Sequence, residues 1–258
     1  MCFMKNKPLI LLTNDDGFEA KGINALLKIL LPLADVVMMA PDSGRSGAAC
    51  SITSSVPVSF YQVSEVEGCV VYKCTGSPVD CVKLALEQVV PRKPDMVVSG
   101  INHGDNASVS VVYSGTMGAV LEGCMKGIPS VGFSAYSTRQ DFDFAPFAPH
   151  IRGIVERVLN EGLPKGVCLN VNIPDTADVQ GVKVCRMAQG NWSAEWVCAA
   201  SPKCKNTYWL TGEFTNMEPD SEDTDFWALD HGFVSVVPTH VDLTAHWAME
   251  QLKDLEQL

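Results

Sequence analysis

The chain has 258 residues, of which 47% are hydrophobic, and a formal net charge of −11. This length suits one large α/β domain with a smaller appendage, and the apolar fraction is ample for a core. The acidic balance argues against a DNA- or RNA-binding scaffold, which needs a basic face, and no apolar run approaches the length of a membrane span, so we expect no membrane partner.

The cysteine pattern gives an indication of the cellular compartment of the protein. Ten cysteines are scattered along the chain, and no C-x-x-C pair occurs. The N-terminus leads into the first expected strand without the pattern of a signal peptide. We therefore expect reduced thiols, a cytoplasmic location and no zinc site.

The first predicted element is a strand over residues 9–12 that runs directly into Thr13, Asn14, Asp15, Asp16 and Gly17. A short, continuous apolar run is typical of a strand buried on both faces of a parallel sheet. Adjacent carboxylates at an apolar strand end repel each other and lose hydration, and a bound cation relieves both costs. We therefore expect a divalent metal at this position.

Alternating strand and helix patterns follow. The sequence predicts a helix from residue 23 to Pro32, a helix capped by Ser77 with Pro78 next, a helix beginning at Tyr113–Thr116 and ending at Gly127, and a helix over 151–158 that ends at Gly162. Further strands are predicted at 35–40, 56–62, 69–74, 94–99, 128–133 and 167–173, with a turn at 64–68 between the third and fourth strands of the chain. The alternation through residue 134 predicts the α/β class, with right-handed βαβ units and a parallel sheet.

The sequence pattern changes at about residue 180, where the alternation of predicted strands and helices ends. We expect a core over 1–180 and an appended subdomain or protruding arm over 181–258. Within the second part, the sequence predicts a solvated acidic loop over 218–225, a strand over 232–238 and an amphipathic helix from Asp242 onward.

Polar side chains follow three of the predicted strands. The loops carry Asp15 and Asp16, then Ser43 and Ser46, and then the segment 100–107 with Asn102 and Asn106. Because ligands bind at the carboxyl ends of parallel strands, neighbouring strands would bring these loops together. Carboxylate, hydroxyl and amide oxygens suit Mg²⁺ or Mn²⁺.

A helix start lies beyond these loops, at Tyr113, Ser114, Gly115 and Thr116. Its unpaired N–H groups and two hydroxyls can bind an anion. A hard cation beside a phosphate site indicates metal-assisted phosphate-ester hydrolysis. Each loop alone also fits a plain turn, a flexible segment or a helix cap, and only their shared position at strand ends favours a site.

Five motifs in order carry a specific resemblance: Thr-Asn-Asp-Asp-Gly (13–17), Ala-Pro-Asp-x-x-Arg-Ser-Gly (40–47), Gly-Ser-Pro-x-Asp-Cys (76–81), Val-Ser-Gly-Ile-Asn-x-Gly-x-Asn (98–106) and Tyr-Ser-Gly-Thr (113–116). Together they resemble the stationary-phase survival protein SurE family of 5′/3′-nucleotidases, and residues 240–244 are also similar to that family. One departure is Cys50, where relatives commonly carry a polar residue.

The resemblance implies a Rossmann-like, three-layer core with a mostly parallel sheet, and C-terminal arms that exchange between subunits of a homodimer or homotetramer. It implies a metal-dependent phosphatase acting on nucleoside 5′- and 3′-monophosphates, with a breadth that extends to short polyphosphate. By motif position, one Mg²⁺ or Mn²⁺ per subunit is held by Asp15, Asp16, Ser46 and Asn102.

Of these four ligands, Asp15, Asp16 and Asn102 are the expected catalytic residues. The expected phosphate-binding residues are Asn106, Ser114, Gly115 and Thr116.

Several roles stay open at this stage. The general base is either one of the aspartates or no separate residue. His103 is either a general acid or a loop residue lining the cleft, and Arg45 binds either phosphate or a surface carboxylate. A non-enzymatic, metal-dependent nucleotide-binding or sensor module is the main alternative function. A dinucleotide-dependent oxidoreductase is disfavoured because no G-x-G-x-x-G follows the first strand.

Overall fold

The computed structural model describes residues 7–139, 141–200 and 206–258. Its main strands are β1 (Leu9–Thr13), β2 (Asp35–Pro41), β3 (Phe60–Val66), β4 (Cys69–Cys74), β5 (Met96–His103), β6 (Ser130–Ala135), β7 (Val167–Ile173), β8 (Gly181–Val184) and β13 (Phe233–His240). The α-helices are α1 (Lys21–Leu30), α2 (Pro78–Gln88), α3 (Gly115–Met125), α4 (Ala148–Glu161) and α5 (Asp225–Asp230).

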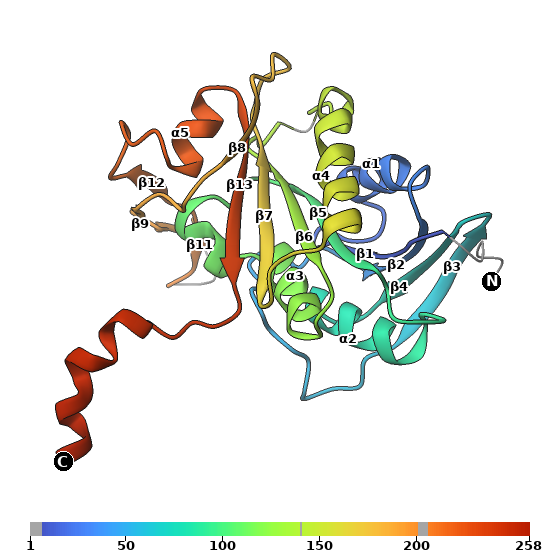
Figure 1. Ribbon diagram of the computed structural model, residues 1–258, viewed down its shortest axis with the longest axis horizontal. Coiled ribbons are helices and arrows are strands. Elements are labelled where there is room, and N and C mark those ends of the chain that lie inside the picture. Colours follow the sequence, from blue (N-terminus) through green and yellow to red (C-terminus); the bar gives the residue numbers. More distant parts are fainter. Residues whose placement is uncertain (1–6, 140, 201–205) are drawn as a thin grey trace.

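One nine-stranded sheet, in the order β3-β4-β2-β1-β5-β6-β7-β13-β8, forms the centre of the molecule. The six strands from β4 to β7 are parallel, whereas β3, β13 and β8 run in the opposite direction. Helices cover both faces, with α1 and α4 on one side and α2 and α3 on the other (Figure 1). The expected α/β class and mostly parallel, three-layer core are confirmed.

The apolar patterns explain these layers. β1 and β2 are buried along their whole length, as their continuous apolar runs predict. Ile23 and Leu26 of α1 pack in the same apolar cluster as Ile151 and Val155 of α4. The predicted cap of α2 is also confirmed, because Ser77 forms a capping box with Asp80.

One connection differs in hand from the others. The chain moves in one direction along the sheet from β1 to β2 through α1, and in the other direction through α2 and α3 on the opposite face. From β6 to β7 the chain moves in that second direction again. However, the connecting helix α4 lies on the same face as α1, so this connection has the opposite hand to the other three. The segment before α4 consequently lies beside α1, where Lys21 donates to the carbonyl of Phe142 at 2.7 Å.

Residues after 180 contribute to the central sheet as well as to a protruding part. β8 and β13 both follow residue 180 in the chain and lengthen the central sheet, so the sheet contains residues from both sides of residue 180. Between them lies the arm, defined here as residues 186–224. In the arm, β9 (Gly190–Ser193) pairs with β12 (Glu213–Asn216), and β10 (Trp196–Cys198) pairs with β11 (Tyr208–Leu210), both antiparallel.

Three of the predicted elements were wrong in their bounds. β3 begins at Phe60, four residues later than expected, and its turn is shorter because the strand continues through a bulge between Gln62 and Ser64. β5 continues to His103, so residues 100–103 form part of a strand and not a loop.

Two predictions near the C-terminus were also wrong. The acidic stretch 218–225 is not wholly a solvated loop, because Asp225 is buried and begins α5. The C-terminal segment forms 3₁₀ helices, η3 (His246–Ala248) and η4 (Glu250–Gln257), and no α-helix. It projects away from the sheet with no buried residue, so the packing that usually stabilises a short amphipathic α-helix is missing (Figure 1).

In the part of the chain that the structure describes, no helix has the length and apolarity needed to cross a bilayer.

Candidate active site

The three polar loops meet at one edge of the sheet. β2, β1 and β5 are neighbours, which confirms that their carboxyl ends lie together. The N–H of Arg45 donates to the carbonyl of Asp15 at 2.7 Å, and the N–H of His103 donates to Oδ2 of Asp16 at 3.1 Å. Hydrogen bonds therefore join all three segments around the aspartate pair.

The aspartate pair is held in a fixed turn. Asn14 donates from Nδ2 to the carbonyl of Gly17 at 2.9 Å and accepts the N–H of Gly17 at 3.2 Å. Burial raises the pKa of Asp15 to about 6, against the lowering effect of the Thr116 hydroxyl and with a further contribution from Asp16. Burial also raises the pKa of Asp16, although the N–H of His103 opposes it.

Neither carboxylate has an ion pair with a Lys or Arg among the described residues. Two adjacent carboxylates without a cationic side chain favour a bound cation. Ser46 and Asn102 line the same cavity as Asp15, and their hydroxyl and amide oxygen complete an all-oxygen set of candidate donors. Asn102 uses its amide nitrogen to donate to the carbonyl of Gly104 at 2.8 Å.

These donors fit Mg²⁺ or Mn²⁺. Among the described residues, no group of three or more His, Cys, Asp or Glu side chains could hold a metal, which leaves this mixed oxygen set as the candidate.

The first turn of α3 presses against Asp15. Ser114 caps the helix by accepting the N–H of Met117 at 3.0 Å, and the hydroxyl of Thr116 donates to Oδ1 of Asp15 at 2.5 Å. At Gly115, an added Cβ would lie 2.8 Å from Cβ of Asp15, closer than real side chains approach. Only glycine therefore allows the helix start to approach the carboxylate this closely.

Asn106 is held from three sides. Its Nδ2 donates to Oγ of Ser134 at 2.7 Å, its N–H donates to Oδ1 of Asn172 at 2.8 Å, and its carbonyl accepts from Nδ2 of Asn170 at 2.8 Å. The sequence reasoning missed Ser134, Asn170 and Asn172. The available signal was the pair of asparagines inside the apolar strand over 167–173, because a buried polar side chain needs a partner.

A cavity of about 570 Å³ contains most of the expected site. Its walls include Asp15, Ser46, Asn102, Asn106 and Ser114, and also Tyr113, Trp192, Glu195, Leu210 and Thr211. Trp192, Glu195, Leu210 and Thr211 belong to the arm and are not among the site residues expected from the sequence.

Three expected site residues do not line this cavity. Gly115 and Thr116 lie behind Asp15, whereas Asp16 lines a separate cavity of about 240 Å³ together with Lys21 and Arg139. His103 lines both cavities, and its buried Nε2 has no hydrogen-bond partner among the described residues.

Two other candidates lie outside the main cavity. Arg45 contacts Oδ1 of Asp42 at 3.4 Å and the carbonyl of Thr75 at 3.1 Å, which matches the surface role among its two alternatives. Ser43 does not line the cavity, whereas Ser46 does, although both hydroxyls follow the same strand.

Comparisons with known proteins identify relatives over nearly the whole chain. The family model described as "Survival protein SurE" matches residues 10–194. A protein of Phocaeicola vulgatus named "5'-nucleotidase SurE" is 57% identical over 250 residues, which cover 97% of each chain. A protein of Bacteroides thetaiotaomicron with the same name is 53% identical over 95% of each chain.

A solved structure agrees as well. The crystal structure of the SurE protein from Aquifex aeolicus superimposes with a TM-score of 0.83 at 38% identity, and the match covers 96% of this chain and 100% of that chain. The family model and the full-length relatives together show that this chain belongs to the survival protein SurE family.

Proposed function

We propose that this protein is a metal-dependent phosphomonoesterase that hydrolyses nucleoside 5′- and 3′-monophosphates to nucleoside and phosphate. The observation that carries the proposal is the pair Asp15 and Asp16, which have no Lys or Arg partner in the described chain and lie beside the start of α3. The names of the full-length relatives support the same activity.

The proposed metal ligands are Asp15, Asp16, Ser46 and Asn102, for one Mg²⁺ or Mn²⁺ per subunit. When bound, such an ion supplies Lewis-acid polarisation of the phosphoryl group and activation of water. Asn102 and the two aspartates are the catalytic residues of this proposal.

We propose that the phosphate lies against Asn106 and the first turn of α3. The N–H groups at the start of a helix favour an anion, so Ser114, Gly115 and Thr116 would stabilise charge that develops on the phosphoryl oxygens. The hydroxyl and the backbone N–H of Thr116 both interact with the carboxylate of Asp15, so Thr116 would act mainly by orienting that carboxylate.

The activity test uses purified protein with AMP and with a 3′-monophosphate. We expect phosphate release with Mg²⁺ or Mn²⁺, loss of release in EDTA and recovery after the metal is returned. Asp15→Asn and Asp16→Asn should each lower kcat at least a thousandfold, whereas Asp220→Asn, at an exposed carboxylate of the arm, should not change it. Full activity in EDTA contradicts the metal dependence. Saturable nucleotide binding without phosphate release supports the sensor alternative instead.

We also propose that the core over 1–180 is completed by a C-terminal part, 181–258, that exchanges with a partner subunit in a homodimer or homotetramer. Leu243, Trp247, Leu252 and Leu255 are exposed on the projecting segment, and burial against a second copy would remove this apolar surface from water. Light scattering on the full chain and on Trp247→Asp tests this. A dimer or tetramer that the substitution leaves intact contradicts it.

A cytoplasmic location is likewise proposed, with support from the free thiols of the described cysteines.

A further inference from the structure

The cavity that contains the candidate metal ligands has two chemically different ends. Its lining comes from two parts of the fold: Asp15, Ser46 and Asn102 at the ends of the strands, here called the first end, and Trp192, Glu195 and Thr211 of the arm, here called the arm end. Its volume of about 570 Å³ is in the range that encloses a whole small molecule. A phosphate held at the first end therefore leaves room for the rest of its substrate to extend to the arm.

We propose that the arm end of this cavity is the base-binding subsite, in which Trp192 stacks on the nucleobase and Glu195 excludes further anionic groups. The inference rests on the proposed phosphomonoesterase activity and defines which substrates the site prefers: phosphomonoesters with one phosphate and a planar, uncharged base. It departs from the expected breadth toward short polyphosphate.

Neighbouring aromatic rings hold the side chain of Trp192 in a fixed position. It lies opposite Phe214 in the β9–β12 pair, and the two rings meet edge to face with centroids 5.5 Å apart. Phe214 in turn stacks on Phe226 of α5 at 4.7 Å, and Phe226 is buried. The indole is therefore packed against an aromatic column on one side, while 38% of the residue remains exposed. A base stacks favourably on such a ring without a requirement for sequence-specific hydrogen bonds.

The backbone near Trp192 also restricts the position of its side chain. Gly212 has φ +136°, and an added Cβ would lie 3.0 Å from Cε3 of Trp192, so a larger residue would displace the indole. The N–H of Thr211 donates to the carbonyl of Glu195 at 2.7 Å. This bond ties the two chain segments that carry Glu195 and Thr211 into the same wall of the cavity.

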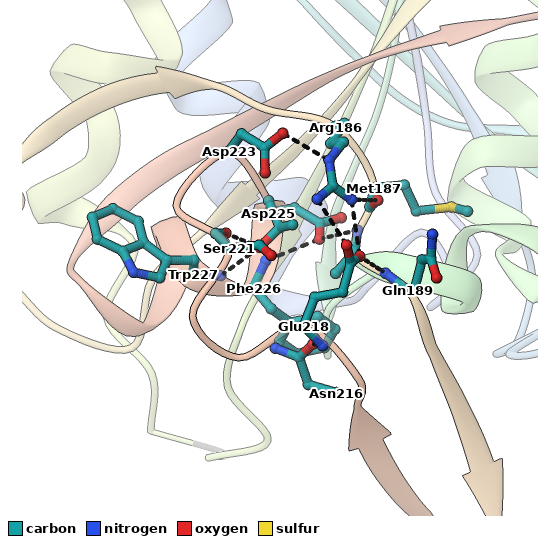
Figure 2. Close-up of polar contacts among 12 residues, drawn as sticks. Arg186, Met187, Gln189, Asn216, Glu218, Ser221, Asp223, Asp225, Phe226 and Trp227 are labelled. Carbon is teal, nitrogen blue, oxygen red and sulfur yellow. Dashed lines mark hydrogen bonds and ion pairs between the residues drawn. The ribbon is translucent and has the colours of Figure 1, made fainter.

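A polar network holds together the first and last residues of the arm, here called its root. The outgoing and returning segments are joined by Arg186, which contacts both carboxylate oxygens of Glu218 at 2.8 and 2.9 Å and Oδ2 of Asp223 at 2.7 Å (Figure 2). The N–H of Gln189 also donates to Glu218 at 2.7 Å. Bidentate Arg–carboxylate pairs restrict orientation, so the two segments are held together in one geometry.

The same root contacts the loop at the phosphate end. Asp225 accepts the N–H of Ala188 at 3.0 Å and the N–H of Ser108 at 2.8 Å. Ser108 begins the short helix η1 (Ser108–Tyr113), whose last residue lines the cavity. Asp225 thus links the arm to the segment that precedes Ser114, so hydrogen bonds connect the two parts of the fold that line the cavity.

The charges of the cavity favour a single phosphate. Among the described residues its lining contains the carboxylates Asp15, Asp105 and Glu195 but no Lys or Arg. A divalent cation at the first end would offset the charge of the aspartate pair, while Glu195 at the arm end has no such partner in the cavity wall. A second or third phosphate extending toward the arm would therefore meet an uncompensated like charge, which opposes binding.

The base-stacking part is tested with the full-length protein, AMP and ribose 5-phosphate, which lacks the base. Trp192→Ala should raise KM for AMP between about fivefold and a hundredfold, the usual range for loss of one stacked base, with little change in kcat. The affinity for ribose 5-phosphate, measured as a substrate or as a competitor of AMP, should not change. Trp192→Phe should retain most of the affinity for AMP.

The matched control is Trp209→Ala. Trp209 is a tryptophan of the same arm, 71% exposed, and it does not line the cavity. Its substitution should leave both substrates unaffected.

The charge part is tested with tripolyphosphate at constant free Mg²⁺. Glu195→Gln should raise kcat/KM for tripolyphosphate relative to AMP by roughly tenfold, because one like charge is removed without a change in size. Glu213→Gln, at an exposed carboxylate of β12 outside the cavity, is the control and should leave the ratio unchanged.

Two results overturn the inference while the proposed function stands: equal effects of Trp192→Ala on AMP and ribose 5-phosphate, or no effect on AMP. An unchanged substrate ratio in Glu195→Gln overturns the role of Glu195. Failure of the wild-type protein to release phosphate from AMP in the presence of Mg²⁺ or Mn²⁺ refutes the proposed function itself.

Discussion

The hydroxyl of Thr116 donates a hydrogen bond to Oδ1 of Asp15 at 2.5 Å and so joins the first turn of α3 to the end of β1, 101 positions away in the sequence. Thr116 is fully buried, and Asp15 is only 4% exposed. A buried bond of this kind fixes the orientation of the carboxylate, and groups that orient a metal ligand influence metal affinity and rate. Thr116 is therefore a positioning residue for the proposed site.

Thr116→Val should lower kcat/KM for AMP by about tenfold to a hundredfold and raise the metal concentration needed for half-maximal rate. Valine keeps the shape of the side chain but removes the donor, so the free energy of unfolding should fall by only about 1–2 kcal/mol. Steady-state kinetics across a Mg²⁺ titration measure the effect. Thr116→Ser, which keeps the hydroxyl, serves as the control, and a valine variant with wild-type metal dependence would contradict the role.

Gly115→Ala should displace Asp15, because the new Cβ would lie 2.8 Å from Cβ and 3.0 Å from Oδ2 of that residue. We expect kcat to fall at least about tenfold, as for other small displacements of catalytic groups. The control is Gly153→Ala, within α4, where an added Cβ meets nothing within 4 Å. That change should keep the activity and raise the free energy of unfolding by about 0.5–1 kcal/mol. Equal activity of the two variants would show that the contact is harmless.

The sequence predicted the parts of the fold that depend on local pattern. The strands predicted over 9–12 and 167–173 and the helix that ends at Gly162 follow from apolar periodicity and from capping residues, which are local properties. The shared position of the polar loops also followed, because the carboxyl ends of parallel strands meet by geometry.

The rest depends on long-range contacts that no local pattern encodes. Asn170 and Asn172 support Asn106 from 64 and 66 positions away, and Asp225 reaches Ser108 over 117 positions. In the sequence, Asp225 is one more residue of an acidic stretch, and only its burial distinguishes it. The return of the arm over the cavity is of the same kind, because its short strands have no apolar alternation to reveal their partners.

The capping box of α2 gives a pH-dependent contribution to stability. Asp80 accepts the N–H of Ser77 at 2.8 Å and the N–H of Thr53 at 3.1 Å. Burial alone would raise the pKa of Asp80, but the hydrogen bonds from Thr53 and Ser77 outweigh it and hold the pKa below its ordinary value of 3.8. A depressed folded-state pKa contributes stability that is present above the unfolded pKa and is lost as the pH falls through the folded pKa.

Asp80→Asn should therefore lower the free energy of unfolding by about 1–2 kcal/mol at pH 7, and this difference from wild type should shrink below about pH 4. Urea unfolding at pH 7, 5 and 3.5 measures it. Asp178→Asn, at an exposed carboxylate, is the control variant measured alongside it. A difference that grows as the pH falls would contradict the assignment, because it would require a raised folded-state pKa at Asp80.

Thiol labelling should divide the described cysteines into two classes. Cys50 and Cys198 are exposed, whereas the others are buried, namely Cys69, Cys74, Cys81, Cys124, Cys168 and Cys185. Burial raises the pKa of Cys69 from 9.0 to about 11, so at pH 8 its reactive thiolate is about a hundredfold rarer than at the ordinary pKa.

We expect iodoacetamide at pH 8 to modify Cys198 first, then Cys50, whose pKa is raised by partial burial and by Glu122, and Cys69 at least about a hundredfold more slowly. Peptide mass spectrometry at timed intervals assigns each site, and the same reaction in urea should remove the differences, because unfolding restores both access and ordinary pKa values. Native-state labelling of Cys69 as fast as Cys198 would show that β4 opens to solvent at its first residue, contrary to its buried place beside β2.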